Sequence, residues 1–286
     1  MKIKRCFSTL TCVDASVDEV LTYAKKHAMD GVEFRLDAAQ TICGTSLDDA
    51  DAIRTQFAYA GVTITDLATG VNVTGLGDLD AEMKKAEGCV RLASAVGASA
   101  IRIFVGGHQP KLSVEPKEDI EAIVSFVRTL CDFAEGYGVS VWAETHSSHS
   151  TAASMKALSE RVERGNFAVI WDVLHSIEFR ESPAESVKLL TQGGLLAHVH
   201  LKDARQSDDP DASQYIHTAL GAGTFPLAEV LALLASVDYE GFVSLEYELP
   251  WRPELKAAAS PACTPPAALR WATFSSWAPS TPRAWT

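Results

Sequence analysis

The sequence predicts an α/β fold, a single (β/α)8 barrel of parallel strands, and three observations support this prediction. Eight short runs rich in β-branched and aromatic residues recur along the chain, and segments with helical spacing of apolar residues separate them. The chain has 286 residues, of which 47% are hydrophobic and 22% charged, enough to bury a full core. A doubly wound open sheet gives the same alternation, but the strand count favours the barrel.

The predicted strands follow one another at the spacing of strand–helix units. They cover residues 3–9, 31–36, 62–68, 99–105, 139–145, 167–173, 195–201 and 241–247. Ser or Asp often precedes the helical segments between them, and both are favourable N-caps. Clear examples are Val17 to His27, Ala81 to Val96, Ile120 to Tyr137 and Leu227 to Val237.

Two regions of the chain differ in composition: residues 1–255, the predicted barrel domain, and residues 256–286, a tail. The tail is rich in Ala, Pro and Trp, holds five of the twelve prolines and has no acidic residue. The final helix region of the barrel is therefore expected to be atypical. Two interpretations stay open, an irregular natural extension and an aberrant segment translated in a shifted frame, and disorder fits either.

The composition narrows the class of partner. A formal net charge of -12 repels a phosphate backbone, so we expect no nucleic acid and a small-molecule partner. The six cysteines are scattered without a CxxC pair, which is typical of a reducing compartment. The first residues lack the apolar core of a secretory signal, and no apolar run approaches the roughly 18 residues of a membrane span. These features predict a cytoplasmic protein without a membrane partner.

Metal-competent side chains end the last four predicted strands. In a parallel barrel, alternate side chains point inward and the carboxyl ends of the strands surround the mouth. This alternation turns inward, at one level, Glu144, Asp172, His200 and Glu246. Because converging carboxylates raise each other's pKa, a divalent cation is the natural way to keep them ionised. We expect one such ion, with Mn²⁺ preferred and Mg²⁺, Co²⁺ or Zn²⁺ as alternatives.

Other polar residues share the inner face. His198, one layer below His200, is expected to be a core or supporting histidine. Lys202 points to the mouth, where it suits a substrate phosphate or carboxylate, with a solvated side chain as the alternative. Glu33 and Arg102 lie on inner positions of earlier strands, as substrate contacts or as a structural ion pair. His108 follows a Gly-Gly pair on a mouth loop and is a candidate for contacts with substrate hydroxyls.

Five motifs together resemble the xylose isomerase-like TIM-barrel superfamily, the sugar phosphate isomerase/epimerase family. They are AETH at 143, WDVLH at 171, HVHLKD at 198, LGAGTFP at 220 and GFVSLEYE at 241. By itself LGAGTFP reads as a tight turn rather than a phosphate loop, since no GK[ST] or GxGxxG context surrounds it. The resemblance extends from about residue 3 to Glu254, and it leaves the tail outside.

The resemblance implies roles for individual residues. Glu144, Asp172, His200 and Glu246 correspond to the metal ligands, and Glu144 and Glu246 also to the catalytic pair. His175, three residues after Asp172, corresponds to a substrate contact, and Glu33 matches an acid of the second strand. The full set of candidate substrate contacts is His175, His146, Lys202, Arg205, Glu33, Arg102 and His108.

The family includes ketose 3-epimerases, hydroxypyruvate isomerases, inosose and dehydroshikimate dehydratases, and apurinic-site endonucleases. The resemblance implies a metal-dependent isomerase or epimerase that abstracts a proton from a small ketose, ketose phosphate or related polyhydroxy carbonyl compound through a metal-bound enediolate. The alternative is a dehydratase, a lyase in which His175, His146 or Lys202 supplies the acid. HLKD favours this branch, because typical 3-epimerases carry Gly-Glu and a later Arg after the liganding histidine, which Arg205 replaces only in part.

Two other classes fit less well. The nuclease branch needs extra ligands, but Tyr215 stands where an Asp is expected, and no His occurs between Leu67 and Leu76. The negative net charge also opposes nucleic acid binding. A non-catalytic barrel that binds a metal or a sugar stays open, and so does a homo-oligomer.

Overall fold

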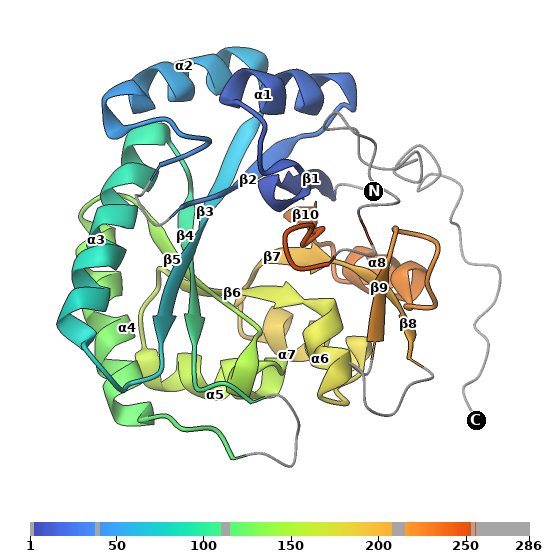
Figure 1. Cartoon of the computed structure of the whole chain (residues 1–286). Coiled ribbons are helices and arrows are strands. Elements are labelled where there is room, and N and C mark those ends of the chain that lie inside the picture. The colour runs from blue at the N-terminus through green and yellow to red at the C-terminus, as the bar shows by residue number, and fades with distance from the viewer. Residues whose placement is uncertain (1–2, 38–40, 110–114, 208–214, 253–254, 256–286) are drawn as a thin grey trace.

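In the computed structural model, eight parallel strands close into a barrel with helices packed around it (Figure 1). The structure describes residues 3–37, 41–109, 115–207, 215–252 and 255. Around the barrel the strands follow the order β1-β10-β7-β6-β5-β4-β3-β2. Their bounds are β1 Lys4–Ser8, β2 Gly31–Arg35, β3 Thr63–Val73, β4 Ala100–Val105, β5 Ser140–Glu144, β6 Phe167–Asp172, β7 Leu196–Leu201 and β10 Phe242–Leu245.

Each of the eight predicted strand segments overlaps one barrel strand, although β3 continues to Val73, beyond the predicted end at residue 68, and the predicted fold class is confirmed. The sequence did not reveal a small antiparallel hairpin, β8 Asp203–Gln206 and β9 Tyr215–Thr218, between β7 and the last helix. Both hairpin strands lie outside the barrel sheet (Figure 1). The motif LGAGTFP follows β9, and its Gly221 takes a positive φ of 84°, as a tight turn requires.

Eight α-helices are present in the described part of the chain. They are α1 Val17–Lys26, α2 Ala50–Ala60, α3 Leu79–Val96, α4 Ile120–Glu135, α5 Ala152–Val162, α6 Val173–Glu178, α7 Pro183–Gln192 and α8 Leu227–Ser236. Polar caps start several of them: Ser16 forms a capping box with Glu19 on α1, and Asp119 accepts backbone N–H groups at the start of α4. The four helices named from the sequence are confirmed.

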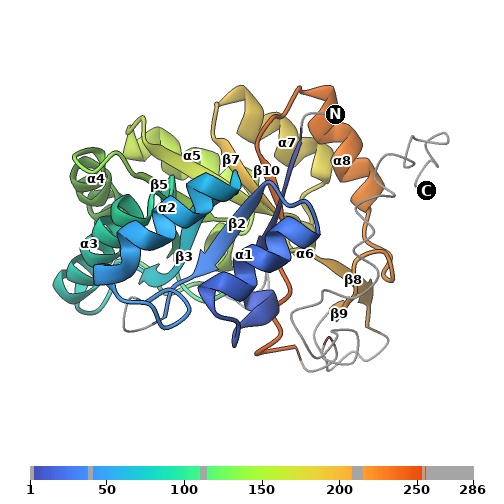
Figure 2. The ribbon, with the colours of Figure 1, turned by 90° about the horizontal axis from the view of Figure 1, so that it is seen from above.

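The end of the barrel departs from a regular (β/α)8 repeat. Helices α6 and α7 both follow β6, and after β10 the described residues 246–252 form no helix, while Leu255 is helical. The expectations for the tail, residues 256–286, lie outside the described residues. Viewed from above, the helices form the outer layer around the strands (Figure 2).

The outward faces of the strands form the main core with the helices. Apolar side chains such as Trp171, Val199, Leu245 and Tyr247 are buried there, and the Trp171 indole N–H donates to Ser176 Oγ at 3.1 Å. Because these residues alternate with inward-facing ones, the polar residues between them are directed into the barrel.

One irregularity in β7 sets the level of the polar residues. Val169 pairs with Leu196, but the next residue, Ile170, pairs with His198, so β7 holds one extra residue at this point. As a result Asp172 lies directly beside His200. Without this shift Asp172 would pair with an outward-facing residue, because a one-residue slip exchanges the two faces of a strand.

Two further features concern the helices and the cysteines. Within the described residues, every helix is too short or too polar to reach across a bilayer. No disulfide joins the cysteines of that same part of the chain.

Candidate metal centre

The structure brings together the four side chains that the strand alternation directs inward. Glu144 ends β5, Asp172 ends β6, His200 lies near the end of β7 and Glu246 directly follows β10. One ligand-competent atom from each lies within 4.8 Å of the others, and all four side chains are buried. Three carboxylates and one imidazole thus converge at the carboxyl end of the barrel.

Atoms in this cluster lack the hydrogen bonds that buried polar atoms normally make. Asp172 Oδ2, Glu246 Oε2 and His200 Nδ1 are buried and accept or donate no hydrogen bond. His200 Nδ1 lies 3.1 Å from Glu246 Oε2 and 3.7 Å from Glu144 Oε1. The Lys202 ammonium lies 2.6 Å from Asp172 Oδ2 and 2.8 Å from Glu246 Oε2 as an ion pair without hydrogen-bond geometry, so both oxygens keep lone pairs that can coordinate a cation.

The buried charges around the cluster also favour a bound cation. Four fully buried carboxylates, those of Glu33, Glu144, Asp172 and Glu246, surround the site. Among the described residues buried with them, two side chains are permanently cationic, Arg102 and Lys202. The carboxylates outnumber these two cations, and in this field a proton on His200 or a bound cation adds the positive charge that buried carboxylates need.

The local fold leaves one oxygen of Asp172 for the site. Its Oδ1 accepts the backbone N–H groups of Leu174 at 2.9 Å and His175 at 3.2 Å, and so caps α6. Its Oδ2 points into the cluster and accepts no hydrogen bond. The N-cap therefore fixes the orientation of the carboxylate before any cation arrives.

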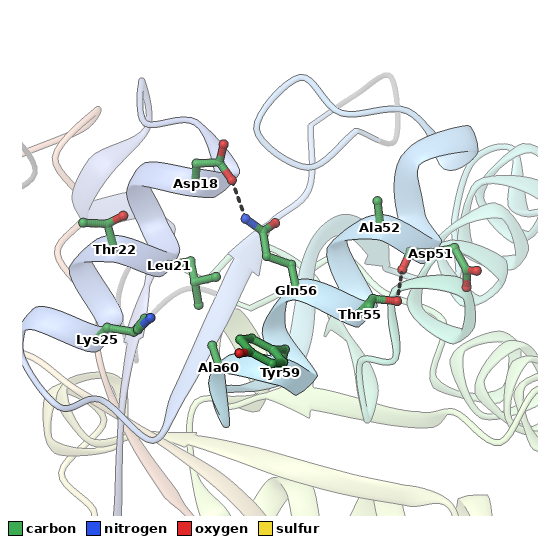
Figure 3. Close-up of a pocket in the computed structure, with 10 residues that line it drawn as sticks. All are labelled: Asp18, Leu21, Thr22, Lys25, Asp51, Ala52, Thr55, Gln56, Tyr59 and Ala60. Carbon is green, nitrogen blue, oxygen red and sulfur yellow. Dashed lines mark hydrogen bonds between the residues drawn. The ribbon is translucent and has the colours of Figure 1, made fainter.

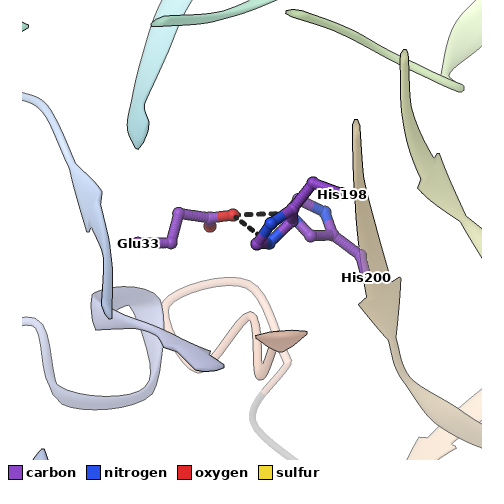
Figure 4. A group of neighbouring side chains, drawn as sticks. All are labelled: Glu33, His198 and His200. Carbon is purple, nitrogen blue, oxygen red and sulfur yellow. Dashed lines mark hydrogen bonds and ion pairs between the residues drawn. The ribbon is translucent and has the colours of Figure 1, made fainter. Parts of the chain in front are cut away.

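Glu33 contacts His200 from across the barrel, as Figure 4 shows. Its Oε2 lies 2.5 Å from His200 Nε2 and 3.6 Å from His198 Nε2. Burial lowers the pKa of His200, but Glu246, Glu33 and Glu144 together hold it well above its ordinary range. The same strong field attracts either a proton or a metal ion to Nδ1. Glu33, His198 and His200 form a second group that could hold a metal ion. Because His200 Nε2 is already bound to Glu33, we interpret this group as a support for the first cluster.

Arg102 supports the opposite side of the cluster. Its Nη1 lies 2.5 Å from Glu144 Oε2, and its Nη2 donates to the Thr69 carbonyl at 2.9 Å. The guanidinium also lies 4.1 Å from the centroid of the Phe104 ring. The alternative of a Glu33–Arg102 ion pair is thus wrong, because Arg102 pairs with Glu144 and Glu33 with His200.

Lys202 is more deeply placed than a mouth-facing lysine would be. It is 1% exposed, and its Nζ lies 2.6 Å from Asp172 Oδ2, 2.8 Å from Glu246 Oε2 and 2.7 Å from Glu248 Oε1. Glu248 lies two residues after Glu246, beyond the end of β10, and its Oε2 also contacts Arg252 Nε at 3.1 Å. The ammonium is therefore surrounded by carboxylates and not by solvent.

Three aromatic rings line the mouth next to the cluster. The His146 ring packs between Phe104, tilted at 4.6 Å between ring centroids, and His175, edge to face at 4.8 Å. His175 Nδ1 lies 2.9 Å from the Thr145 carbonyl, so it carries the proton, and Nε2 is the acceptor. Partly exposed rings of this kind can contact the face of a sugar.

Two candidate substrate contacts lie farther out. His108 is exposed in the loop after β4, and Arg205 is exposed on the hairpin strand β8. Among the described residues, neither makes a hydrogen bond or an ion pair with the cluster. Their role stays a prediction.

Asp66 was missed by the sequence reading. It is 0% exposed and accepts from the Thr65 hydroxyl at 2.9 Å, while its Oδ2 has no hydrogen bond. Burial, and then the nearby Glu33, raise its pKa well above the ordinary value. The sequence signal for Asp66 was an acidic residue inside the apolar run VTITDLA. Because the register between β2 and β3 shifts, strand alternation does not predict whether the Asp66 side chain points into or out of the barrel.

A groove on the outside of the barrel does not belong to the cluster. It lies between α1 and α2 and encloses about 810 Å³ (Figure 3). Its lining residues are Asp18, Leu21, Thr22, Lys25, Asp51, Ala52, Thr55, Gln56, Tyr59 and Ala60. Gln56 bridges to Asp18 across it. The groove contains neither His nor Cys, and its two carboxylates, Asp18 and Asp51, are bound to Gln56 and Arg54.

Comparisons with known proteins agree with this geometry. A family profile described as xylose isomerase-like TIM barrel matches residues 21–267. Among curated proteins, an uncharacterized protein of Methanocaldococcus jannaschii, MJ1311, is 26% identical over 155 residues, or 52% of this chain and 50% of that protein. The chain therefore spans about half the length of this relative.

Solved structures share the fold over almost the whole chain. D-psicose 3-epimerase, crystallised in the presence of D-fructose, has a TM-score of 0.74 at 19% identity, covering 95% of this chain and 99% of that one. The probable 3-DHS dehydratase AsbF of Bacillus anthracis has 0.73 at 19%, covering 91% and 100%. The IOLI protein with a binding zinc atom has 0.73 at 20%, covering 91% and 94%. At these identities the likeness establishes the fold alone.

Proposed function

The chain belongs to the xylose isomerase-like TIM barrel family, and from this premise we propose that it is a metal-dependent isomerase or epimerase. Its proposed substrate is a small ketose, ketose phosphate or related polyhydroxy carbonyl compound. The observation that carries the proposal is the buried convergence of Glu144, Asp172, His200 and Glu246. Three of its buried atoms, Asp172 Oδ2, Glu246 Oε2 and His200 Nδ1, make no hydrogen bond, and the two oxygens are in ion-pair contact with Lys202.

These four residues would hold one divalent ion. When bound, the ion would polarise a substrate carbonyl and acidify the neighbouring C–H bond. The donor set is rich in oxygen and has no thiolate, which favours Mn²⁺, Mg²⁺ or Co²⁺, and zinc in the IOLI structure keeps Zn²⁺ open.

Glu144 and Glu246 are the proposed proton-transfer pair. They come from β5 and β10, which are separated by β6 and β7 in the barrel order, so they approach the mouth from different sides. One carboxylate would remove a proton from one face of a substrate carbon, and the other would return a proton to the opposite face. Arg102 keeps the Glu144 carboxylate in a fixed orientation through its 2.5 Å contact.

The mouth residues suit a small polar substrate. His175 Nε2 can accept a hydrogen bond from a substrate hydroxyl, and the rings of His146 and Phe104 provide an adjacent apolar face. We propose a sugar-like small molecule as the partner, in a cytoplasmic protein without nucleic acid or membrane partners. The net charge of -12 and the absence of a membrane-crossing helix among the described residues support this.

A dehydratase is the second candidate, and the position of Lys202 favours it. Dehydration needs an acid near the leaving hydroxyl, and the Lys202 ammonium lies within 2.8 Å of both Asp172 and Glu246. The shared fold with the probable dehydratase AsbF is compatible with this reading. Both candidates begin with abstraction of a proton next to a carbonyl, so the same ligands serve either.

Solvent exchange tests both candidates at their common step. The protein is incubated in D2O with each divalent metal and a panel of ketoses, ketose phosphates and cyclic hydroxy ketones, and proton NMR follows the C–H signals. We expect deuterium to enter at one carbon with the wild type and not with Glu246→Gln. A new epimer or isomer identifies the first candidate, and a new enone absorbance identifies the dehydratase.

A matched control separates chemistry from folding. Glu229→Gln makes the same change on the exposed face of α8 and should exchange deuterium at the wild-type rate. Stoichiometric metal binding without exchange on any compound would contradict the proposal and favour a metal- or sugar-binding barrel.

A further inference from the structure

Lys202 is buried within the same cluster as the proposed ligands. It follows the last residue of β7 and is 1% exposed. Its Nζ donates a hydrogen bond to Glu248 Oε1 at 2.7 Å. It also lies in ion-pair contact with Asp172 Oδ2 at 2.6 Å and Glu246 Oε2 at 2.8 Å.

The two ion-paired oxygens are also the oxygens expected to bind a metal. Neither Asp172 Oδ2 nor Glu246 Oε2 accepts a hydrogen bond, so the ammonium approaches them as a charge and not along a hydrogen-bond direction. A divalent ion on the same two oxygens would lie within a few ångströms of Nζ. At that separation two cations repel strongly, because the buried site screens them poorly.

Glu248 offers the ammonium a second position. Its Oε1 already accepts from Lys202, and its Oε2 lies 3.1 Å from Arg252 Nε. The Glu248 side chain is 17% exposed, whereas Asp172 and Glu246 are almost completely buried. Lys202 can therefore keep its contact with Glu248 while it moves away from the other two carboxylates toward the mouth.

We propose that Lys202 is a tethered counter-cation of the metal centre. In the metal-free protein its ammonium neutralises Asp172 and Glu246, and metal binding displaces it toward Glu248. This inference rests on the proposed metal site, and it adds that the chain carries its own competitor for that site. The consequence is a protein that folds without metal and binds the metal less tightly, and more exchangeably, than its four ligands alone would.

The test replaces Lys202 by a side chain of similar length without charge. Lys202→Met, the wild type and Lys156→Met, a control at a half-exposed, ion-paired lysine of α5, are compared at pH 7.5. Mn²⁺ affinity is measured by competition with a chromophoric chelator, and melting temperature with EDTA and with saturating Mn²⁺. We expect Lys202→Met to bind Mn²⁺ about tenfold or more tightly than the wild type. It should also melt roughly 3 °C or more lower, but only in EDTA.

Each outcome decides the proposal. Unchanged or weaker Mn²⁺ binding, or an equal loss of melting temperature with and without Mn²⁺, would make Lys202 a structural or substrate-binding residue and overturn the inference alone. If neither protein binds Mn²⁺, the proposed metal site and the inference fail together. Binding by Lys202→Met but not by the wild type would support the inference in its strongest form.

A second variant keeps the test valid if Lys202→Met does not fold. Glu248→Gln leaves Lys202 in place but removes the carboxylate toward which the ammonium moves when the metal binds. We expect its Mn²⁺ affinity to fall about threefold to tenfold, because the ammonium then stays closer to the metal ligands. Wild-type affinity in Glu248→Gln would contradict the displacement.

Discussion

His200 and Glu33 face each other across the barrel, with His200 Nε2 2.5 Å from Glu33 Oε2. Their strands, β7 and β2, are separated by β10 and β1 in the barrel order, and both side chains are fully buried. Because Nε2 is engaged by the carboxylate, Nδ1 is directed at Glu246 and Glu144. A carboxylate thus fixes the ring orientation of the one nitrogen ligand in the cluster.

The first prediction concerns this contact. Glu33→Gln keeps the shape of the side chain and one acceptor oxygen but removes the charge that orients His200. We expect Mn²⁺ affinity to fall about 10- to 100-fold, as for other supporting residues of metal-bound histidines. Chelator competition measures the change, and Glu229→Gln on α8 is the control. Unaltered affinity would mean that Glu33 does not position His200.

The second prediction concerns the two proposed proton-transfer residues. Glu246→Gln and Glu144→Gln should each reduce deuterium exchange about 10²- to 10⁴-fold, because each removes a base of the pair. Glu144→Gln should also destabilise the protein more than Glu246→Gln does, since it leaves the buried Arg102 without its carboxylate. Exchange rates and urea unfolding of both variants check the two statements. Full activity in Glu246→Gln would refute its assignment.

The barrel was predictable from sequence because its signals are local and repeated. Eight β-rich runs, Ser and Asp caps such as Ser16 and Asp119, and amphipathic helices each follow from nearest neighbours along the chain. The hairpin β8–β9 was not predictable in this way. Its strands are short, and its register depends on pairing between Asp203 and Thr218, fifteen positions apart.

The ligand cluster was predictable as a set because strand alternation and strand order place its members together. Their partners were not. Glu33 reaches His200 from the other side of the barrel, and Arg102 selects Glu144 over Glu33. Such contacts depend on the diameter of the closed barrel and on register shifts, and the sequence of one strand determines neither. The burial of Lys202 has the same origin, because three carboxylates from other strands surround it.

The third prediction uses His217, which is 6% exposed on β9. Burial, and then the positive charge of Arg252, lower the pKa of His217 to about 4. Between pH 6.5 and pH 4 the unfolded chain therefore binds a proton at this residue that the folded protein does not, so stability falls as the pH falls. From the size of the shift this histidine costs roughly 3 kcal/mol by pH 4.

A phenylalanine at this position separates the effect of His217 from general acid denaturation. His217→Phe keeps the ring, so its urea stability should fall less steeply than that of the wild type between pH 6.5 and pH 4. His108→Gln, which changes an exposed loop histidine, should follow the wild-type curve. Parallel curves for wild type and His217→Phe would show that His217 does not contribute.

The fourth prediction concerns Asp203, which organises the turn before α8. Its carboxylate accepts the backbone N–H groups of Ala204, Gly221, Gly223 and Phe225 at 2.7 to 3.3 Å. Asp203→Ala should cost about 3 kcal/mol in urea unfolding, because it leaves several N–H groups without an acceptor. Asp14→Ala, at an exposed position, is the control. A change below about 0.5 kcal/mol would show that water replaces the carboxylate.

The fifth prediction separates two histidines of one strand, His198 and His200. His198 is fully buried between the rings of Trp142 and Phe242, and burial, as the largest cause, lowers its pKa to about 3, so it is neutral. His198→Asn should therefore leave a gap in this stack and cost roughly 2 to 3 kcal/mol, while Mn²⁺ affinity changes less than about threefold. His200→Asn should instead lower Mn²⁺ affinity at least about 100-fold, since it removes the nitrogen ligand. Urea unfolding and chelator competition on both variants give the two readouts. Equal loss of Mn²⁺ affinity in the two variants would mean that His198, and not only His200, belongs to the ligand set.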